Sequence, residues 1–192
     1  MPPRKRLRFF HFLETDAPEW IDEQEYHRGR LADYERALLG PGMIEGLRVD
    51  PNAPADLNVI VRPGSGIDAD GHLFELTVDQ VLNLADFVPP SGTQIVYIVA
   101  AYAEQATDPV FVDELGQNEF ARLLDSVTVR AQVELPTAPW IEIARVELAA
   151  GATAITAPVN PDAPQANEID RRYGIGVGGA FRRRVITMVA GG

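Results

Sequence analysis

Three glycines in the C-terminal part of the sequence have a spacing that could support nucleotide chemistry. Gly174, Gly176 and Gly179 satisfy the G-x-G-x-x-G pattern of dinucleotide-binding loops. Such a loop follows a strand, opens a helix that receives a pyrophosphate, and is followed about 20 positions later by an acidic residue. Residues 180–192 contain no acidic residue. The pattern therefore does not predict a dinucleotide site, and we expect no cofactor.

A second group of residues could bind a hard cation. Asp68, Asp70 and His72 alternate along one short stretch, and oxygen ligands are the ones that Ca²⁺ and Mg²⁺ prefer. The glutamate that closes a calcium-binding loop is missing at the required spacing. Asp70 and Gly71 also form a dipeptide typical of a β-hairpin turn. We therefore favour a turn here and expect no metal-binding residues.

The remaining candidates for chemistry are the histidines. The chain has three, His11, His27 and His72, and it has no cysteine. The missing cysteines exclude disulfides, thiolate metal sites and a cysteine nucleophile. No nucleophile-elbow motif is present. We expect no catalytic residues and predict that the chain is not an enzyme, with a triad assembled from distant residues as a weaker hypothesis.

Composition predicts a soluble, mainly β protein. Hydrophobic residues make up 46% of the chain, and the 15 prolines and 16 glycines indicate frequent turns and few helices. The formal net charge of −11 repels a nucleic-acid backbone, so we expect no direct nucleic-acid partner. No apolar run approaches the roughly 18 residues of a membrane helix, and His11 and Glu14 interrupt the apolar stretch of the N-terminus. We expect neither membrane insertion nor a signal peptide.

One helix is predicted, over residues 16–39. Asp16 and Glu19 form a capping-box pattern, and the Gly-Pro-Gly of residues 40–42 ends the helix. One stripe of this helix follows a heptad spacing, and its members are Trp20, Gln24, His27, Leu31, Tyr34 and Leu38. Two interpretations of this helix seam stay open. It lies on the chain's own sheet, or it self-associates with Gln24 and His27 as polar layers that set the register.

From residue 43 the hydrophobic period changes to that of strands. Apolar alternation and turn signals predict strands at 43–49, 57–62, 77–84, 93–104 and 126–136, a hairpin within 66–76, and a strand, turn and second short strand within 140–156. Residues 63–66 are predicted as a turn. Residues 93–104 are apolar on both faces, which predicts a central strand covered on both sides. The stretch 108–125 is left open between a short helix near 118–125 and a loop.

The two ends of the chain are basic, and the middle is acidic. The basic residues include Arg4, Arg6 and Arg8 at the start and Arg182, Arg183 and Arg184 at the end. Such a pattern favours contacts between neighbouring subunits of an assembly. We divide the chain into a basic and aromatic N-terminal arm, a helix with its turn, an antiparallel β domain, and an extended linker with a basic Gly-rich tail, at residues 1–13, 14–42, 43–156 and 157–192.

Two blocks of sequence resemble a known module. The first runs from "RLRFFHFLETDAPEWIDEQEYHRGR" through "GPGMIEGLRV" to "VIVRPGSGIDADGHLFEL". It resembles the N-terminal module of many phage baseplate and tail-fibre proteins and of related contractile injection system components. The matching positions are Glu23, Tyr26, His27, Arg28, Gly40, Gly42, Gly46, Leu47, Val49, Pro63, Gly64, Gly66, Asp68 and Gly71. The second block, "IEIARVELAAGATAIT" followed by "EIDRRYG", is similar to tail-fibre segments that end in Asp-x-Arg, at Ile169, Asp170 and Arg171.

The resemblance implies a structural protein. We expect a mainly β (α+β) fold, in which an N-terminal amphipathic helix is followed by an antiparallel β-sandwich and an extended C-terminal strap. The expected function is that of a baseplate, tail or fibre-attachment subunit of a phage or phage-like contractile tail. Its partners would be other tail or baseplate subunits and further copies of itself, as a homo-trimer or higher oligomer, in a particle assembled in the bacterial cytoplasm. The interface residues we expect are those of the helix seam, together with the six terminal arginines named above.

A different class of function is kept beside this one. A small carbohydrate-binding β-sandwich, or a receptor-binding accessory, would present aromatic platforms such as Trp140, Tyr97 or Tyr102 to a sugar. These aromatics stand on apolar strands, which favours a place in the core for most of them.

Overall fold

The computed structural model describes residues 5–177 of the chain. The fold is mainly β, with one N-terminal α-helix and antiparallel sheets, as the sequence predicts. The elements are, in chain order, α1 (Ala17–Leu38), β1 (Gly42–Gly46), β2 (Val49–Pro51), β3 (Asn58–Val61), β4 (Gly64–Ile67), β5 (Leu73–Leu76), β6 (Gln80–Asn83), the 3₁₀ helix η1 (Ala85–Phe87), β7 (Thr93–Val112), β8 (Gln117–Gln132), β9 (Ile141–Ala149) and β10 (Ile169–Asp170).

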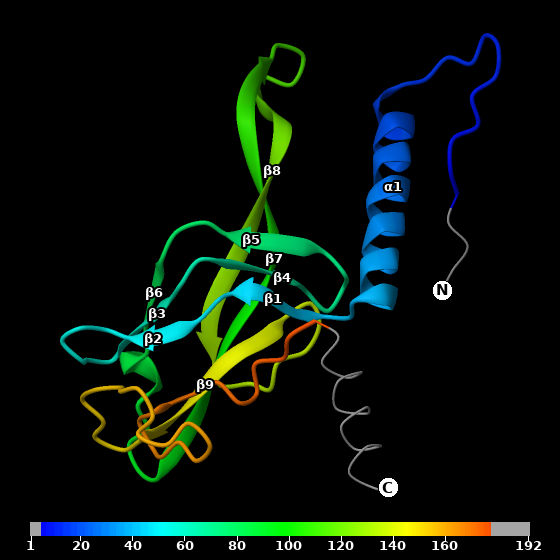
Figure 1. The fold of residues 1–192 in the computed structure, drawn as a ribbon. Coiled ribbons are helices and arrows are strands. Elements are labelled where there is room, and N and C mark those ends of the chain that lie inside the picture. Colours follow the sequence, from blue (N-terminus) through cyan, green and yellow to red (C-terminus); the bar gives the residue numbers. More distant parts are fainter. Residues whose placement is uncertain (1–4, 178–192) are drawn as a thin grey trace, which may run out of the picture.

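The helix begins and ends where its local signals place it. Asp16 is the N-cap and forms a capping box with Glu19, whose carboxylate accepts the Asp16 backbone N–H at 3.1 Å. This satisfies donors that the first turn of a helix leaves without partners. Leu39 and Gly40 follow the helix, and Gly40 has a positive φ of 71°. The helix rises beside the β body and does not lie flat on a sheet (Figure 1).

Three antiparallel sheets build the body. One has four strands in the order β10-β9-β7-β8, and two have three strands each, in the orders β1-β4-β5 and β2-β3-β6. Apolar side chains from all three sheets meet in one core, including Val61, Phe74, Ile98 and Val146. The core therefore lies between the four-stranded sheet and the two smaller ones, as in a β-sandwich.

Strand β7 is the centre of the largest sheet. Residues Ile98, Val99, Ala100 and Ala101 are all at most 1% exposed, so the strand is covered on both faces there, as its apolar run predicts. The strand is longer than predicted and continues to Val112, and its partner β8 begins at Gln117. The stretch 108–125 is thus neither helix nor loop. It forms most of a long hairpin that projects from the body (Figure 1).

Two further strand predictions are corrected. The predicted strand 43–49 breaks into β1 and β2, which belong to different sheets, because the chain turns at Gly46 and Leu47 with positive φ values of 62° and 53°. The predicted turn 63–66 is mostly strand β4. Here a Cβ on Gly64 would lie 2.2 Å from the backbone nitrogen of Leu47. The glycine is needed for the close approach of two backbone segments and not for a turn.

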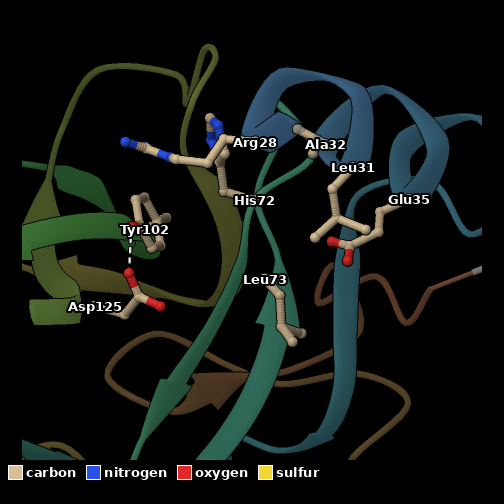
Figure 2. Close-up of a pocket in the computed structure, with 9 residues that line it drawn as sticks. Arg28, Leu31, Ala32, Glu35, His72, Leu73, Tyr102 and Asp125 are labelled. Atoms are coloured by element: carbon tan, nitrogen blue, oxygen red, sulfur yellow. Dashed lines mark hydrogen bonds between the residues drawn. The ribbon is translucent and has the colours of Figure 1, made fainter. Parts of the chain in front are cut away.

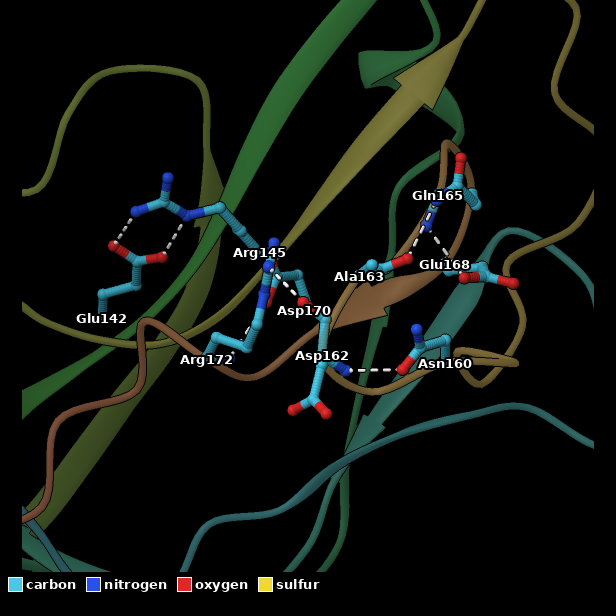
Figure 3. Close-up of polar contacts among 9 residues, drawn as sticks. All are labelled: Glu142, Arg145, Asn160, Asp162, Ala163, Gln165, Glu168, Asp170 and Arg172. Atoms are coloured by element: carbon cyan, nitrogen blue, oxygen red, sulfur yellow. Dashed lines mark hydrogen bonds and ion pairs between the residues drawn. The ribbon is translucent and has the colours of Figure 1, made fainter.

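The strap that follows β9 is held on the body by polar contacts. Strand β10 pairs with β9, and the side-chain oxygen of Asn167 accepts the Ala149 backbone N–H at 2.9 Å. Figure 3 shows how the strap folds over this edge, where the Glu168 carboxylate accepts the Gln165 backbone N–H at 2.9 Å. Arg172 donates to the Asp162 carbonyl at 2.7 Å. Side chains thus serve as hydrogen-bond partners for backbone groups of this proline-rich segment, as acceptors at Asn167 and Glu168 and as a donor at Arg172.

Candidate functional site

A cavity of about 300 Å³ lies where helix α1 meets the body (Figure 2). Its lining comes from the helix, from the turn between β4 and β5, and from the β7–β8 hairpin. Ala32, the one buried residue of the helix, packs against Gly71. A Cβ on Gly71 would lie 2.2 Å from the Ala32 carbonyl oxygen, so only glycine permits this approach. The Asp-Gly turn that the sequence predicts is therefore also the point at which the helix packs against the body.

Asp68 organises the turn behind this cavity. Its carboxylate is 1% exposed and accepts backbone N–H groups of Asp70 at 3.0 Å, His72 at 2.9 Å and Tyr102 at 3.3 Å. Three N–H donors satisfy a buried carboxylate without a cation. Asp68 thus ties the β4–β5 turn to strand β7. Within residues 5–177, no group of three or more His, Cys, Asp or Glu side chains is arranged to hold a metal ion.

Tyr102 joins the hairpin base to the helix. Its hydroxyl lies 2.6 Å from an Asp125 carboxylate oxygen and 3.0 Å from one of Glu104. Burial, together with these two carboxylates, raises the pKa of Tyr102 above its usual value. The phenol carries one O–H donor, so the two carboxylates share its proton, with the shorter contact to Asp125. Arg28 of the helix pairs with Glu104 at 2.6 Å, which completes the connection.

The helix seam predicted from the sequence is exposed. Four of its members, Trp20, Leu31, Tyr34 and Leu38, are 51–64% exposed, and Gln24 and His27 are exposed as well. The body contacts an adjoining face of the helix, through Arg28 and Ala32, and among the seam residues Leu31 also borders the cavity there. The interpretation in which the seam lies on the chain's own sheet is therefore wrong. The apolar stripe on this projecting helix thus stays more than half exposed at Trp20, Leu31, Tyr34 and Leu38.

The N-terminal arm folds back along the helix. The Leu7 backbone N–H donates to the Glu23 carboxylate at 2.9 Å, and the Phe9 and Trp20 rings lie 5.8 Å apart. Glu23 precedes Ala32 by nine residues, which at about 100° per residue places it on the opposite side of the helix. The arm therefore lies on the face that points away from the body (Figure 1). Its Phe10 and Phe12 are 66% and 90% exposed.

The arginines predicted as interface residues fall into two groups. Arg6 and Arg8 lie exposed on the arm, and within residues 5–177 neither forms an ion pair. The other four, Arg4, Arg182, Arg183 and Arg184, lie outside the described residues.

The hairpin tip, defined as residues 105–124, is a surface that the sequence did not reveal. It turns at residues 113–116, where Gly116 has a positive φ of 66°. Only Thr107 and Val112 are partly covered, and every other residue of the tip is exposed. Its exposed large apolar side chains are Val110, Phe111, Leu115, Phe120, Leu123 and Leu124. The signal that could have found it is the Asp-Glu-Leu-Gly turn between two alternating apolar stretches.

The two blocks of the sequence resemblance meet in space. The Arg171 guanidinium donates its Nε to the Val49 carbonyl at 2.8 Å and its Nη2 to Asp50 at 3.0 Å. Beside it, backbone hydrogen bonds of 2.8 and 2.9 Å join Met43 to Ile175 and Val177. Burial raises the pKa of the Asp50 carboxyl, but the hydrogen bond from Arg62 and the charges of Arg48 and Arg171 outweigh it, so the net shift is downward. These motif residues join the two blocks and close the body.

The aromatic side chains proposed as sugar platforms have little open ring surface. The Arg130 guanidinium lies 3.8 Å from the centre of the Trp140 ring, and that of Arg145 lies 5.0 Å from the centre of the Tyr97 ring. Tyr102 is engaged by its two carboxylates and partly buried. A sugar would have to displace these contacts before it could stack.

In strand β9, the ion-pair partner of Arg145 differs from the one that the sequence pattern predicts. The alternation along this strand places Arg145 and Glu147 on one face and predicts that they form a solvated pair. Arg145 instead pairs with Glu142, with hydrogen bonds of 2.6 and 2.9 Å. A β-bulge opposite Ile98 and Val99 shifts the register and brings positions 142 and 145 together. The Arg145 guanidinium also lies 3.4 Å from the centre of the Tyr173 ring, so it anchors the strap.

Comparisons with known proteins give few matches. No protein-family model and no curated protein matches the chain. Among solved structures, it is similar to TssK in a crystal structure, with 14% sequence identity and a TM-score of 0.49 over 78% of this chain and 39% of that one. A chain of the baseplate complex from the type VI secretion system gives 14% identity and a TM-score of 0.48 over 81% of this chain and 41% of that one. The chain spans about two-fifths of the length of these solved chains.

Within the described residues, no helix has the length and hydropathy needed to cross a bilayer.

Proposed function

We propose that the chain is a structural subunit of a phage or phage-like contractile tail, in the baseplate or at a fibre attachment, and that it acts by docking to neighbouring subunits. The observation that carries this proposal is the exposure of apolar side chains on three elements, the arm, the helix and the hairpin tip. Phe12 on the arm, Trp20 on the helix and Phe111 on the hairpin tip are 90%, 51% and 60% exposed. Clusters of exposed apolar side chains are typical of protein–protein contact sites.

The body does not need these elements for its own core. The core is built from the three sheets, and the helix contributes only one buried residue, Ala32. Residues 105–124 contribute none. An arm, a helix and a hairpin tip that add so little to the monomer are explained if they are covered by other subunits. The turn and strand positions shared with phage baseplate and tail-fibre modules support the same proposal.

In this proposal, several weak contacts act together. Each subunit would use the helix seam and the arm of residues 1–13 as separate docking sites, in a homo-trimer or a larger symmetric assembly. Closed symmetry repeats every contact around the ring. Contacts that are weak one by one then gain strength from the high effective concentration within the particle. The particle would assemble in the bacterial cytoplasm.

The test is co-sedimentation with tail particles. A tagged copy of the chain is produced in the source strain, the particles are separated on a density gradient, and the fractions are viewed by electron microscopy. We expect the tag in the fraction that contains tail-shaped particles, at a fixed ratio to the other tail proteins. A tag that stays at the top of the gradient, while the particles sediment, would refute the proposal.

A matched pair of variants locates the contact. Trp20→Ala with Leu31→Ala removes apolar area from the seam and should reduce the co-sedimenting fraction. Val159→Ala with Leu135→Ala removes apolar area from two residues that are 92% and 69% exposed elsewhere, and it should leave that fraction unchanged.

A further inference from the structure

The hairpin tip and the N-terminal arm have complementary surfaces. The tip carries four acidic residues, Asp108, Asp113, Glu114 and Glu119, and one basic residue, Arg122, so its formal net charge is −3. The described part of the arm carries Lys5, Arg6 and Arg8 and no acidic residue before Glu14. Both surfaces also expose large apolar side chains, with Phe111 and Phe120 on the tip and Phe10 and Phe12 on the arm. An acidic apolar surface thus matches a basic apolar one.

The charges that would form this contact have no ion-pair partners of their own. Within residues 5–177, Asp113 and Glu114 form no ion pair, and neither do Lys5, Arg6 and Arg8. The charged pair on the tip, Arg122 with Asp108 at 3.4 Å, leaves the turn itself acidic. Opposite charges placed in this way steer two surfaces together and fix their register.

The tip does not contact the arm of its own chain. The helix meets the body through Ala32, whereas the arm is fixed at Glu23 on the opposite side of the helix. Figure 1 shows the helix standing between the hairpin and the arm. The tip and the arm therefore face away from each other within one subunit, and each is available to a neighbour.

Resting on the proposed function, we infer that the hairpin tip of one copy docks onto the N-terminal arm and the adjoining outer face of helix α1 of the next copy. The occupant of the arm surface is a second copy of this chain, through its residues 105–124. Because two different surfaces meet, the contact is head-to-tail. Such a contact generates a closed ring when the rotation between copies closes, and an open filament when it does not.

The inference is tested by reversing charges on each surface and then on both. Asp113→Lys with Glu114→Lys reverses the tip, and Arg6→Glu with Arg8→Glu reverses the arm. Native mass is measured by light scattering over a range of protein concentrations at low salt. The native chain should form multimers, and each double variant should raise the concentration of half-assembly by about tenfold or more. The quadruple variant should regain assembly, because its arm and tip are again opposite in charge.

A control of equal size separates this contact from a general charge effect. Asp86→Lys with Glu134→Lys reverses two exposed acidic residues outside the tip, and it should assemble like the native chain. Thermal unfolding of every variant checks that the body is folded. The native contact should also weaken as salt is added, because salt screens exposed charges beyond about 10 Å at 0.1 M.

Three results would overturn the inference. They are a native chain that stays single at every concentration, double variants that assemble like the native chain, and a quadruple variant no better than the double variants. None of these results depends on co-sedimentation with particles. A chain that co-sediments but shows no pairing of tip and arm would refute this inference and leave the proposed function standing. A chain whose tip and arm pair, but which never enters particles, would support this inference and refute the proposed function.

Discussion

Gly71→Ala should loosen the helix from the body, and its cost can be worked from the structure. The added Cβ would lie 2.2 Å from the Ala32 carbonyl oxygen and 3.0 Å from the Arg36 Cβ, and the backbone at Gly71 has a φ of 94°. Strain of a non-glycine residue at positive φ costs about 1–2 kcal/mol. Overpacking against the helix costs about 1–3 kcal/mol more.

The helix can avoid the overlap by moving away from the body, so the free energy of releasing the helix is an upper limit on the cost of the overlap. Release would expose Ala32, at about 0.8 kcal/mol per buried methyl-sized group. It would also break the partly exposed Arg28–Glu104 pair, a class of contact that contributes about 1 kcal/mol or less. The overlap therefore costs about 2 kcal/mol at most, and we expect a total destabilisation of about 2–4 kcal/mol for Gly71→Ala.

A second glycine provides the control. Gly151 has a similar positive φ of 72°, but a Cβ there would meet nothing within 4 Å. Gly151→Ala should therefore show the strain alone, about 1–2 kcal/mol. Urea unfolding measures both variants, and hydrogen exchange of residues 17–38 should accelerate in Gly71→Ala and not in Gly151→Ala. Equal losses of unfolding free energy and equal hydrogen-exchange rates in the two variants would refute the close packing of the helix against Gly71.

The other predictions concern the body. Burial raises the pKa of Asp50 and neighbouring guanidinium groups lower it, with a net downward shift from 3.8. The stabilisation from the charged carboxylate is therefore complete above about pH 4 and is lost as the pH falls through the lower pKa of the folded state. Asp50→Asn should reduce stability at pH 7 and flatten the fall of stability between pH 5 and pH 2, and an unchanged slope in urea unfolding across pH would contradict this. Arg171→Lys loses the two-pronged contact with the Val49 carbonyl and should cost about 1–2 kcal/mol in the same assay, whereas a neutral result would show that a single ammonium suffices. Leu148→Ala, at a fully buried position, should cost about 2–5 kcal/mol, while Leu135→Ala, at a 69% exposed one, should stay within about 0.5 kcal/mol, and thermal unfolding compares them.

The parts of the fold that the sequence predicts are those with local signals. The capping box of Asp16 and Glu19 places the start of the helix, and the Asp70–Gly71 dipeptide places the turn between β4 and β5. The alternation of residues 141–149 predicts β9. In each case the deciding contacts lie within a few residues of one another, so the pattern is readable without knowledge of the partners.

The parts that the sequence does not predict depend on distant partners. Residues 118–125 contain Glu, Ala, Arg and Leu, which favour a helix. Pairing with residues 105–112 makes them a strand, and this pairing is visible only once β7 is known to continue past residue 104. The bulge in β9 is equally non-local, because it depends on the register with β7. For that reason the sequence pattern pairs Arg145 with Glu147 and misses its partner Glu142.

The same limit applies to the candidate site. The seam spacing identifies which helix residues form one stripe, but it does not say whether the stripe faces the body. The side that packs is decided by Gly71, whose missing Cβ admits Ala32 and so turns Trp20 and Tyr34 outward. A small residue in a turn thus determines which face of a distant helix is free for a partner.

This division between body and projections separates stability from assembly. The side chains that hold the monomer together, such as Ile98 and Leu148, lie in the three-sheet core, whereas Phe12 and Phe111 are exposed on elements that add little to it. Substitutions on the projecting surfaces should therefore leave the unfolding temperature of the monomer nearly unchanged, since exposed positions shift stability by about 0.5 kcal/mol or less. Any large effect they have on particles must then arise from lost contacts between subunits. A chain built in this way can change its partners by altering the arm or the tip without refolding its body.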